Sequence, residues 1–214
     1  TSTLCACLAT HAAFLHFHNI ERQPLVTKRW GVFSHRVVLE HPFVRNVNTR
    51  FNVPHSRWNE ITAKQMTQAS QLVLVESEEA GIHLATSADG LRLVFFQGHP
   101  EYDDFSLLKE YKREVNRFLA GEIDDYPHYP DHYFSKEALS LLEAYRESAI
   151  RSRQQGVSID DFPEQTIPVE NTWGDTGKMI FNNWLGTVYQ LTGQDRRAPF
   201  MPGIDPQEPL AQLF

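Results

Sequence analysis

The chain has 214 residues, of which 41% are hydrophobic and 22% charged, and its formal net charge is −7. That length is enough for one domain with a sizeable core, and the acidic balance argues against nucleic acid or an anionic membrane as a partner. No apolar run approaches the roughly 18 residues that a membrane-spanning helix needs. Two cysteines, Cys5 and Cys7, are too few for a disulfide framework, so we expect a reducing, cytoplasmic environment.

The first predicted elements are a strand and a helix. Residues 3–6 form a short apolar run that predicts a buried strand, which continues through Cys7 into an Ala-rich helical pattern over residues 8–15. Later strands are predicted at 71–75 and in a hairpin between 82 and 96. Two or three further strands are few for a sheet covered on both faces. We therefore expect the first strand to pair on one side only, with other strands supplied by an N-terminal segment outside this chain or by a separate chain.

The second half of the chain is predicted to be mainly helical. Helical patterns occur at 104–119, 135–155 and 176–191. Ser135 is suited to cap the second of these helices. We expect a single α/β domain over residues 1–214, with a helical insertion at about 124–169 and an irregular, proline-rich tail at 193–214.

Cys7 stands where the predicted strand turns into the predicted helix. Such a turn exposes the thiol, and the oriented N–H groups of a helix N-terminus lower its pKa, which favours the nucleophilic thiolate. The backbone N–H of Leu8 is then suited to stabilise an oxyanion formed on an acyl group. A cysteine between alanine and leucine is more often a small core residue, so this position alone does not decide the function.

His99 and Glu101 follow the last predicted strand. Side chains two residues apart in an extended segment project to the same side, so Glu101 can hydrogen-bond one nitrogen of His99 while the other nitrogen faces a thiol. Taken alone, the segment is explained equally well as an ordinary polar loop. The remaining histidines are scattered, and the group at positions 11, 16 and 18 has no Cys or carboxylate at zinc spacing, so we expect no metal site.

Six short motifs accompany Cys7 along the chain. They are Gly31-Val32-Phe33-Ser34-His35-Arg36, Pro54-His55-Ser56-Arg57-Trp58, Glu76-Ser77-Glu78-Glu79-Ala80-Gly81, Gly98-His99-Pro100-Glu101-Tyr102-Asp103, Glu110-Tyr111-x-Arg113 and Phe181-Asn182-Asn183-Trp184-Leu185. With these motifs in this order, the chain resembles the C-terminal portion of the homoserine O-succinyltransferase and homoserine O-acetyltransferase family, within the class I glutamine amidotransferase-like superfamily.

The resemblance implies a fold and a set of site residues. The implied fold is a flavodoxin-like, three-layer α/β sandwich with a mostly parallel sheet. Cys7 matches the acyl-thioester nucleophile, His99 its general base and Glu101 the partner of that base. Three further residues match substrate-binding positions, namely Lys28, Ser56 and Arg113. A guanidinium fork suits an amino acid's carboxylate, whereas Ser56 with Arg57 is equally suited to cap a helix from Trp58 onward.

The reaction implied by the resemblance is ping-pong acyl transfer from acyl-CoA, through Cys7, to the hydroxyl of L-homoserine in methionine biosynthesis. Acyl-CoA is a co-substrate, and no cofactor is expected. We also expect a homodimer. Serine as acceptor stays open, since it differs by one methylene. A glutamine amidotransferase and a non-catalytic binding module on the same fold stay open as well. The chain departs from the family pattern at Ser34, where glutamate is usual, and in the length of the 124–169 region.

Overall fold

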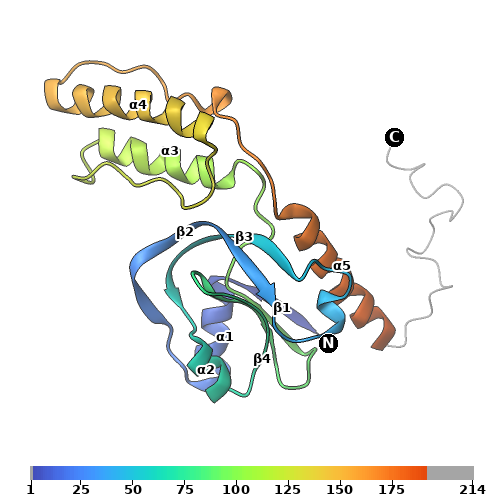
Figure 1. The fold of residues 1–214 in the computed structure, drawn as a ribbon. Helices are drawn as coiled ribbons and strands as arrows, with labels where there is room; N and C mark the ends of the chain where they lie inside the picture. The colour runs from blue at the N-terminus through green and yellow to red at the C-terminus, as the bar shows by residue number, and fades with distance from the viewer. Residues whose placement is uncertain (1, 192–214) are drawn as a thin grey trace, which may run out of the picture.

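The computed structural model describes residues 2–191, which form an α/β fold around one six-stranded sheet (Figure 1). In sheet order the strands are β1 (Thr3–Ala6), β6 (Leu93–Phe96), β5 (Gly81–Thr86), β4 (Leu72–Ser77), β2 (Gln23–Val37) and β3 (Arg50–Glu60). The helices are α1 (Leu8–His18), α2 (Ala63–Gln68), α3 (Ser106–Leu119), α4 (Lys136–Gln155) and α5 (Gly174–Leu191), with 3₁₀ turns η1 (Pro42–Val44) and η2 (Glu164–Thr166). The predicted α/β class is confirmed.

The direction of the strands differs from the prediction. Within residues 2–191 only β1 and β6 pair in parallel, while the other neighbouring strands are antiparallel. The expectation of a mostly parallel sheet is therefore wrong for the part of the chain that the structure describes. The physical reason is the short connections, because tight turns such as the one at Gly90 between β5 and β6 can join only antiparallel neighbours.

Strands β2 and β3 form a long antiparallel ribbon that the sequence pattern did not predict. In this ribbon Trp30 lies opposite Ser56. Basic and polar residues interrupt the two-residue alternation of both strands, which hides the usual signal of a strand. The aromatic and β-branched residues between 26 and 37 are the signal that could have revealed it. Since Ser56 lies inside β3, the alternative that it caps a helix at Trp58 is wrong.

Helices cover both faces of the sheet. On one face, Phe14 of α1 and Met66 of α2 pack in one core cluster with Phe95 of β6. On the other face, Ile180 of α5 packs in a second cluster that contains Phe96. Phe95 and Phe96 point to opposite faces because successive side chains of a strand alternate. The predicted three-layer arrangement is confirmed.

Helices α3 and α4 lie beside each other, away from the main body of the sheet (Figure 1). They pack with the middle of β2 in a third core cluster that includes Trp30, Tyr111 and Leu142. The predicted cap of α4 is confirmed, because the Ser135 hydroxyl accepts a hydrogen bond of 3.1 Å from the backbone N–H of Ala138. This cluster places α3, and the residues on it, against β2.

The loop between α3 and α4 is tied to β2 at Gly31. The backbone N–H of Val32 donates to the carbonyl of Asp131, and the N–H of Asp131 donates to the carbonyl of Trp30, each over 2.8 Å. Gly31 has a φ of 148°, and a β-carbon there would collide with the Asp131 backbone. Only glycine allows the loop to approach this closely.

The sheet curls, so that β3 reaches the far end of β6 although the two strands are not neighbours. The backbone N–H of His99 donates to the carbonyl of Pro54 over 2.8 Å. The side-chain carbonyl of Gln97 accepts a 2.6 Å hydrogen bond from the N–H of Ile61. The loop after β6, which carries the predicted catalytic histidine, is therefore held between its own strand and β3.

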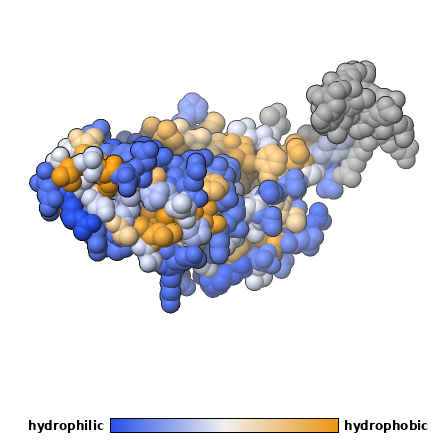
Figure 2. Space-filling view, turned by 90° about the horizontal axis from the view of Figure 1, so that it is seen from above, coloured by the Kyte–Doolittle hydropathy of each residue, from blue (hydrophilic) through white to orange (hydrophobic). Residues whose placement is uncertain are grey.

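Strand β1 pairs with β6 alone among the residues that the structure describes, so the predicted one-sided pairing is confirmed. Beside it, an apolar pocket of about 520 Å³ is lined in part by Leu4, Ala6 and Phe181. Phe181 of α5 is 49% exposed. Figure 2 shows hydrophobic side chains in several places on the upper face of the molecule, separated by hydrophilic ones. The predicted tail at 193–214 lies outside the described residues.

Candidate active site

Cys7 lies at the sharp turn between β1 and α1. Its φ of 46° lies in the left-handed region, which costs a non-glycine residue on the order of 1 kcal/mol. Neighbouring bonds hold the turn: the N–H of Cys7 donates to the carbonyl of Phe96 over 2.8 Å, and the buried Thr10 hydroxyl is placed 2.8 Å from that same oxygen. Cys7 is half-buried, whereas Cys5 is part of the core. The fold thus presents one of the two thiols at the surface.

His99 lies between Cys7 and Glu101. Its Nδ1 is 2.8 Å from Oε1 of Glu101, and the ring also hydrogen-bonds the Cys7 side chain. The ring of Tyr102 stacks on that of His99, with 4.4 Å between centroids and 19° between planes. The structure therefore brings the three predicted catalytic residues together, in the order thiol, imidazole, carboxylate.

The electrostatics of this arrangement favour a thiolate and an imidazolium. The hydrogen bond from His99 lowers the pKa of Cys7 against the opposing effect of burial. Burial also opposes the protonated form of His99, but its hydrogen bonds to Cys7 and Glu101 outweigh burial and raise the pKa of His99 to about 9. Burial would raise the pKa of Glu101, yet the bond to His99 lowers it. An ionised thiol is the form that attacks an acyl group.

The backbone N–H of Leu8, at the start of α1, hydrogen-bonds the Cys7 sulfur and contributes to its lowered pKa. One backbone donor therefore lies beside the thiol, as a role for Leu8 in stabilising an oxyanion requires. That role stays a prediction.

Lys28 and Ser56 meet at a carboxylate that sequence reasoning did not select. Oε2 of Glu110 lies 3.1 Å from Nζ of Lys28 and accepts a 2.5 Å hydrogen bond from the Ser56 hydroxyl. Nζ of Lys28 also lies 4.1 Å from the centre of the Trp30 ring. Burial lowers the pKa of Lys28, and the nearby Glu110 partly offsets this. Burial raises the pKa of Glu110, but its three hydrogen-bond donors lower it on balance.

Arg113 lies on the same side as this carboxylate and is exposed. Its Nε is 3.3 Å from Glu114, and the side chain keeps 62% of its surface accessible. Lys28, Ser56, Glu110 and Arg113 all line one pocket of about 690 Å³. The three predicted substrate-binding residues therefore surround one cavity, which combines fixed cations with carboxylates, as the binding of a zwitterionic amino acid requires.

Tyr102 connects the pocket to the predicted catalytic residues. Its ring stacks on His99, and its hydroxyl donates a 2.7 Å hydrogen bond to Oε1 of Glu110. Trp173 fixes the backbone of Tyr102 through a 2.8 Å bond from its indole N–H. Sequence reasoning missed Tyr102 and Glu110 as site residues. Their places within the motifs of His99 and Arg113 were the available signal.

Neither a metal centre nor a membrane-spanning helix is found in the described part of the chain. Within residues 2–191, no group of three His, Cys, Asp or Glu side chains is arranged to hold a metal ion. None of the helices in the same range is both long and apolar enough to span a membrane.

Comparison with known proteins identifies the family. The sequence model described as homoserine O-succinyltransferase matches residues 1–194. The chain belongs to the homoserine O-succinyltransferase family. A relative from Methylococcus capsulatus with that name is 55% identical over 213 residues, which cover 98% of this chain and 60% of the relative. A relative of the same name from Allochromatium vinosum is 55% identical over 212 residues, with 98% and 59% covered.

The chain thus spans about 60% of the length of the curated relatives that it matches. Because 98% of the chain is aligned, the helical segment at 124–169 lies within the aligned range. Among solved structures, a glutamine amidotransferase from Thermotoga maritima is similar with a TM-score of 0.46 and 12% identity, covering 89% of this chain and 62% of that one. Membership of the family rests on the sequence matches.

Proposed function

We propose that this chain carries the catalytic thiol of an enzyme that transfers a succinyl group from succinyl-CoA to the hydroxyl of L-homoserine, a step of methionine biosynthesis. The observation that carries the proposal is the hydrogen-bonded series Cys7–His99–Glu101 in a chain whose relatives are named homoserine O-succinyltransferase. Ionised thiols paired with imidazolium are nucleophiles for thioester exchange.

In the first half-reaction, the Cys7 thiolate attacks the carbonyl carbon of the succinyl thioester. A bond forms between the Cys7 sulfur and that carbon, and the bond from the carbon to the CoA sulfur breaks. The protonated ring of His99 gives its proton to the leaving CoA thiolate. The N–H of Leu8 stabilises the charge that develops on the carbonyl oxygen. The enzyme then holds a succinyl thioester on Cys7 and a neutral His99.

In the second half-reaction, neutral His99 takes the proton of the homoserine hydroxyl while the hydroxyl oxygen attacks the thioester carbon. The carbon–sulfur bond breaks, and Cys7 leaves as a thiolate beside the regenerated imidazolium. Glu101 keeps Nδ1 of His99 occupied in both steps, so that the other nitrogen faces the thiol. One group therefore serves as acid and then as base.

The pocket beyond Tyr102 is the proposed binding site of homoserine. Arg113 is exposed and suited to pair with the α-carboxylate, and Glu110 is suited to accept from the α-ammonium group. Lys28 and Ser56 orient Glu110 through the bonds described above. An amino acid held by both charged groups of its α-carbon in this way would leave its side chain free to direct the hydroxyl toward His99.

We further propose that β1 has a second neighbour from polypeptide outside residues 2–191, either an N-terminal segment or a separate chain. A nucleophile strand at the edge of a sheet leaves backbone groups unpaired, and a tetrahedral intermediate calls for a second oxyanion donor. The apolar pocket along β1 supports docking on this edge. A cytoplasmic location belongs to the same proposal, since a free thiolate needs a reducing environment.

Mass spectrometry of the intact protein tests the function. Incubation with succinyl-CoA alone should give a succinyl adduct on Cys7, and adding homoserine should remove it and yield O-succinylhomoserine. A preference for serine would support serine as the acceptor. Release of ammonia from glutamine, without any adduct from succinyl-CoA, would instead support an amidotransferase. If neither substrate modifies Cys7, a non-catalytic binding module is favoured and the proposal fails.

A further inference from the structure

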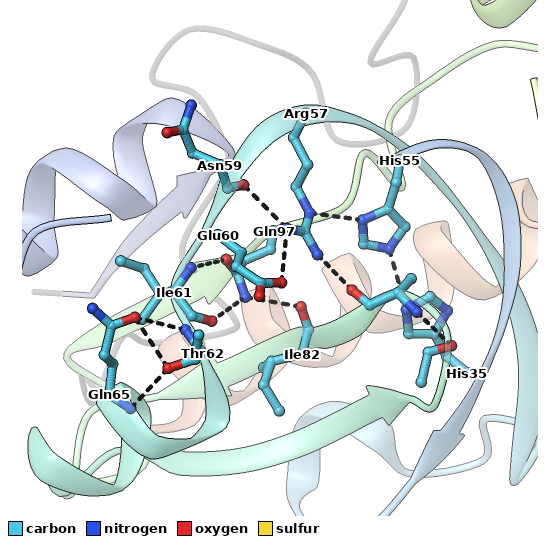
Figure 3. A network of polar contacts seen from close by, with 12 residues as sticks. His35, His55, Arg57, Asn59, Glu60, Ile61, Thr62, Gln65, Ile82 and Gln97 are labelled. Atoms are coloured by element: carbon cyan, nitrogen blue, oxygen red, sulfur yellow. Dashed lines mark hydrogen bonds and ion pairs between the residues drawn. The ribbon is translucent and has the colours of Figure 1, made fainter. Parts of the chain in front are cut away.

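Three fully buried histidines from three strands form a cluster inside the curled sheet. They are His35 of β2, His55 of β3 and His83 of β5. His35 and His55 stack with 5.0 Å between ring centroids, and their Nε2 atoms are 3.1 Å apart. His35 is anchored through Nδ1, 2.9 Å from the carbonyl of Phe33. Figure 3 shows His35 and His55 joined in this way to Arg57.

Arg57 is the charged member of this network. Its guanidinium uses all three nitrogens: Nε donates to Nδ1 of His55 over 3.3 Å, one terminal nitrogen bonds the carbonyl of Asn59 and the Glu60 carboxylate, and the other donates to the carbonyl of Ala80 (Figure 3). Only 3% of Arg57 is exposed. A guanidinium stays protonated in proteins, so this buried charge is permanent.

The histidines around Arg57 are neutral. Burial lowers the pKa of His35 to about 4 and places that of His55 and His83 well below the ordinary value, and the charge of Arg57 acts in the same direction on each of the three. The positive charge of the cluster is therefore that of Arg57 alone. The three packed rings, of which His55 touches the cation, therefore form a support that stays neutral at neutral pH.

This support lies directly under the catalytic loop. Gly98 packs on His55 so closely that a β-carbon there would lie 2.8 Å from Nε2 of His55. On the other side, the Gln97 side chain bonds the N–H and carbonyl of Ile61 and the carbonyl of Ile82, over 2.6 to 3.0 Å (Figure 3). Residues 97 and 98 immediately precede His99. The buried network thus fixes the position of the backbone immediately before His99.

We propose that Arg57 is a positioning residue for the Cys7–His99 pair: it locks His55 under the Gly98–His99 turn and supplies a permanent positive charge to the buried network beneath that turn. The inference rests on the proposed role of Cys7 as the nucleophile. It adds a residue that touches neither substrate nor the imidazole, and whose charge adds to the larger effects of His99 and the Leu8 N–H on the sulfur.

The groups that act on Cys7 come from several elements. His99 and the N–H of Leu8 contact the sulfur directly, and Arg57 acts on it through its charge. The charge of Cys7 contributes to raising the pKa of Tyr102, while Glu101 influences Cys7 through its hydrogen bond to His99. Of these, Arg57 is the one cation that does not titrate near neutral pH. Its removal should therefore move the ionisation of Cys7 while His99 and the N–H of Leu8, the groups that contact the sulfur, are both retained in the chain.

The rate of Cys7 alkylation by iodoacetamide, measured against pH, tests the inference. A Cys5→Ala background leaves Cys7 as the only thiol among the 214 residues. Arg57→Met should raise the midpoint of the pH–rate curve by about 0.5 to 1 pH unit, because a stabilising charge is lost. Arg57→Lys keeps the charge and should restore most of that shift. Arg36→Met removes an exposed arginine of the same sheet and should leave the midpoint unchanged.

A fourth variant distinguishes an effect of the Arg57 charge from a general loosening of the fold. Glu60→Gln removes the carboxylate that partly neutralises Arg57, so the midpoint should stay or fall. Loosening of the fold would raise the midpoint in Glu60→Gln and both Arg57 variants alike, and that result overturns the inference. So does an Arg57→Met curve equal to that of Arg36→Met. If Arg57→Met does not fold, a midpoint raised by about 0.5 pH unit or more above that of the Cys5→Ala parent, in Glu60→Gln or in Arg57→Lys, overturns the inference.

The outcome is distinguishable from failure of the proposed function. If succinyl-CoA modifies Cys7 normally but the alkylation midpoint is the same with and without Arg57, only this inference is contradicted. If the alkylation midpoint shifts when Arg57 is replaced but succinyl-CoA does not modify Cys7, the proposed function is contradicted. The effect of Arg57 on the thiolate then still holds.

Discussion

His99 and the three histidines of the buried cluster lie close together in the fold but differ in charge. The side chain of His99 is 13% exposed and its pKa is raised to about 9, whereas His35, His55 and His83 are fully buried with lowered pKa values. Burial disfavours the protonated ring in all four. Partners decide the difference, because His99 has a thiol and a carboxylate while the inner rings face each other and Arg57.

One fold can therefore hold both a reactive and an inert imidazole. The reactive ring stands where the chain ends a strand and two anionic groups converge on it. The inert rings are enclosed by strands and meet a cation, so they remain neutral and rigid. Substitutions on each side of this contrast should have separate effects, of which the loss of the thiol is expected to be the largest.

Replacing Cys7 by serine removes the anion beside His99 and should reduce succinyl transfer by about 10³-fold or more, because a hydroxyl is not ionised by this pairing. Steady-state rates and the loss of the succinyl adduct measure the effect. Cys5→Ser is the control, since Cys5 is part of the core and should retain most of the activity. Comparable losses in both variants would show that the nucleophile is not resolved between the two thiols.

Glu101→Gln removes the second anionic partner of His99. The pKa of His99 should fall, and turnover should drop by about 10- to 100-fold because the orientation and charge of the ring are no longer fixed. A pH–rate profile detects the change as a basic limb displaced to lower pH. An unchanged profile would mean that the carboxylate does not govern His99.

Arg113 belongs neither to the His99 site nor to the buried histidine cluster, so Arg113→Lys tests acceptor binding separately from both. A point charge replaces a bidentate fork, so the KM for homoserine should rise by about 10-fold while the rate of Cys7 succinylation stays the same. Single-turnover acylation and steady-state KM together measure this. If acylation collapses, Arg113 serves the donor or the fold instead.

The inner histidines should make the fold acid-sensitive. Unfolded histidine takes up a proton near pH 6.5, but native His35 does so only near pH 4, so stability is present above pH 6.5 and is lost as pH falls toward 4. We expect the Tm to fall by about 5 °C or more between pH 7 and pH 5. Thermal unfolding followed by circular dichroism measures this slope.

His83→Phe should reduce that slope. Both ring nitrogens of His83 lack a hydrogen-bond partner among the described residues, so an apolar ring of similar shape removes a buried polar group. The Tm at pH 7 should stay level or rise by a few degrees. A slope identical to that of the parent chain would assign the acid sensitivity to other groups.

The catalytic corner was easier to predict from the sequence than the sheet around it. A strand–helix turn and a two-residue spacing made Cys7, His99 and Glu101 candidates, and the resemblance of the surrounding motifs to a known family selected them. The β2–β3 ribbon was missed since some of its polar and basic positions, His35, His55 and Arg57, face a curled interior that only the folded sheet creates. For the same reason Arg57 was predicted as part of a possible helix cap. Its burial depends on Ala80 and His55, and the contact with Ala80 joins distant parts of the chain.

The close approach of Asp131 to Gly31 attaches the loop that lines the proposed substrate pocket to the sheet, away from the reacting groups. Residues between 123 and 128 form one wall of the proposed homoserine pocket, while Cys7 and His99 lie on the turns that follow β1 and β6 of the sheet to which Asp131 bonds. Substitutions between 123 and 128 can therefore alter the size or charge of the pocket without moving the reacting groups. An enzyme built in this way can acquire a new acceptor by changing one loop, provided that position 31 remains glycine.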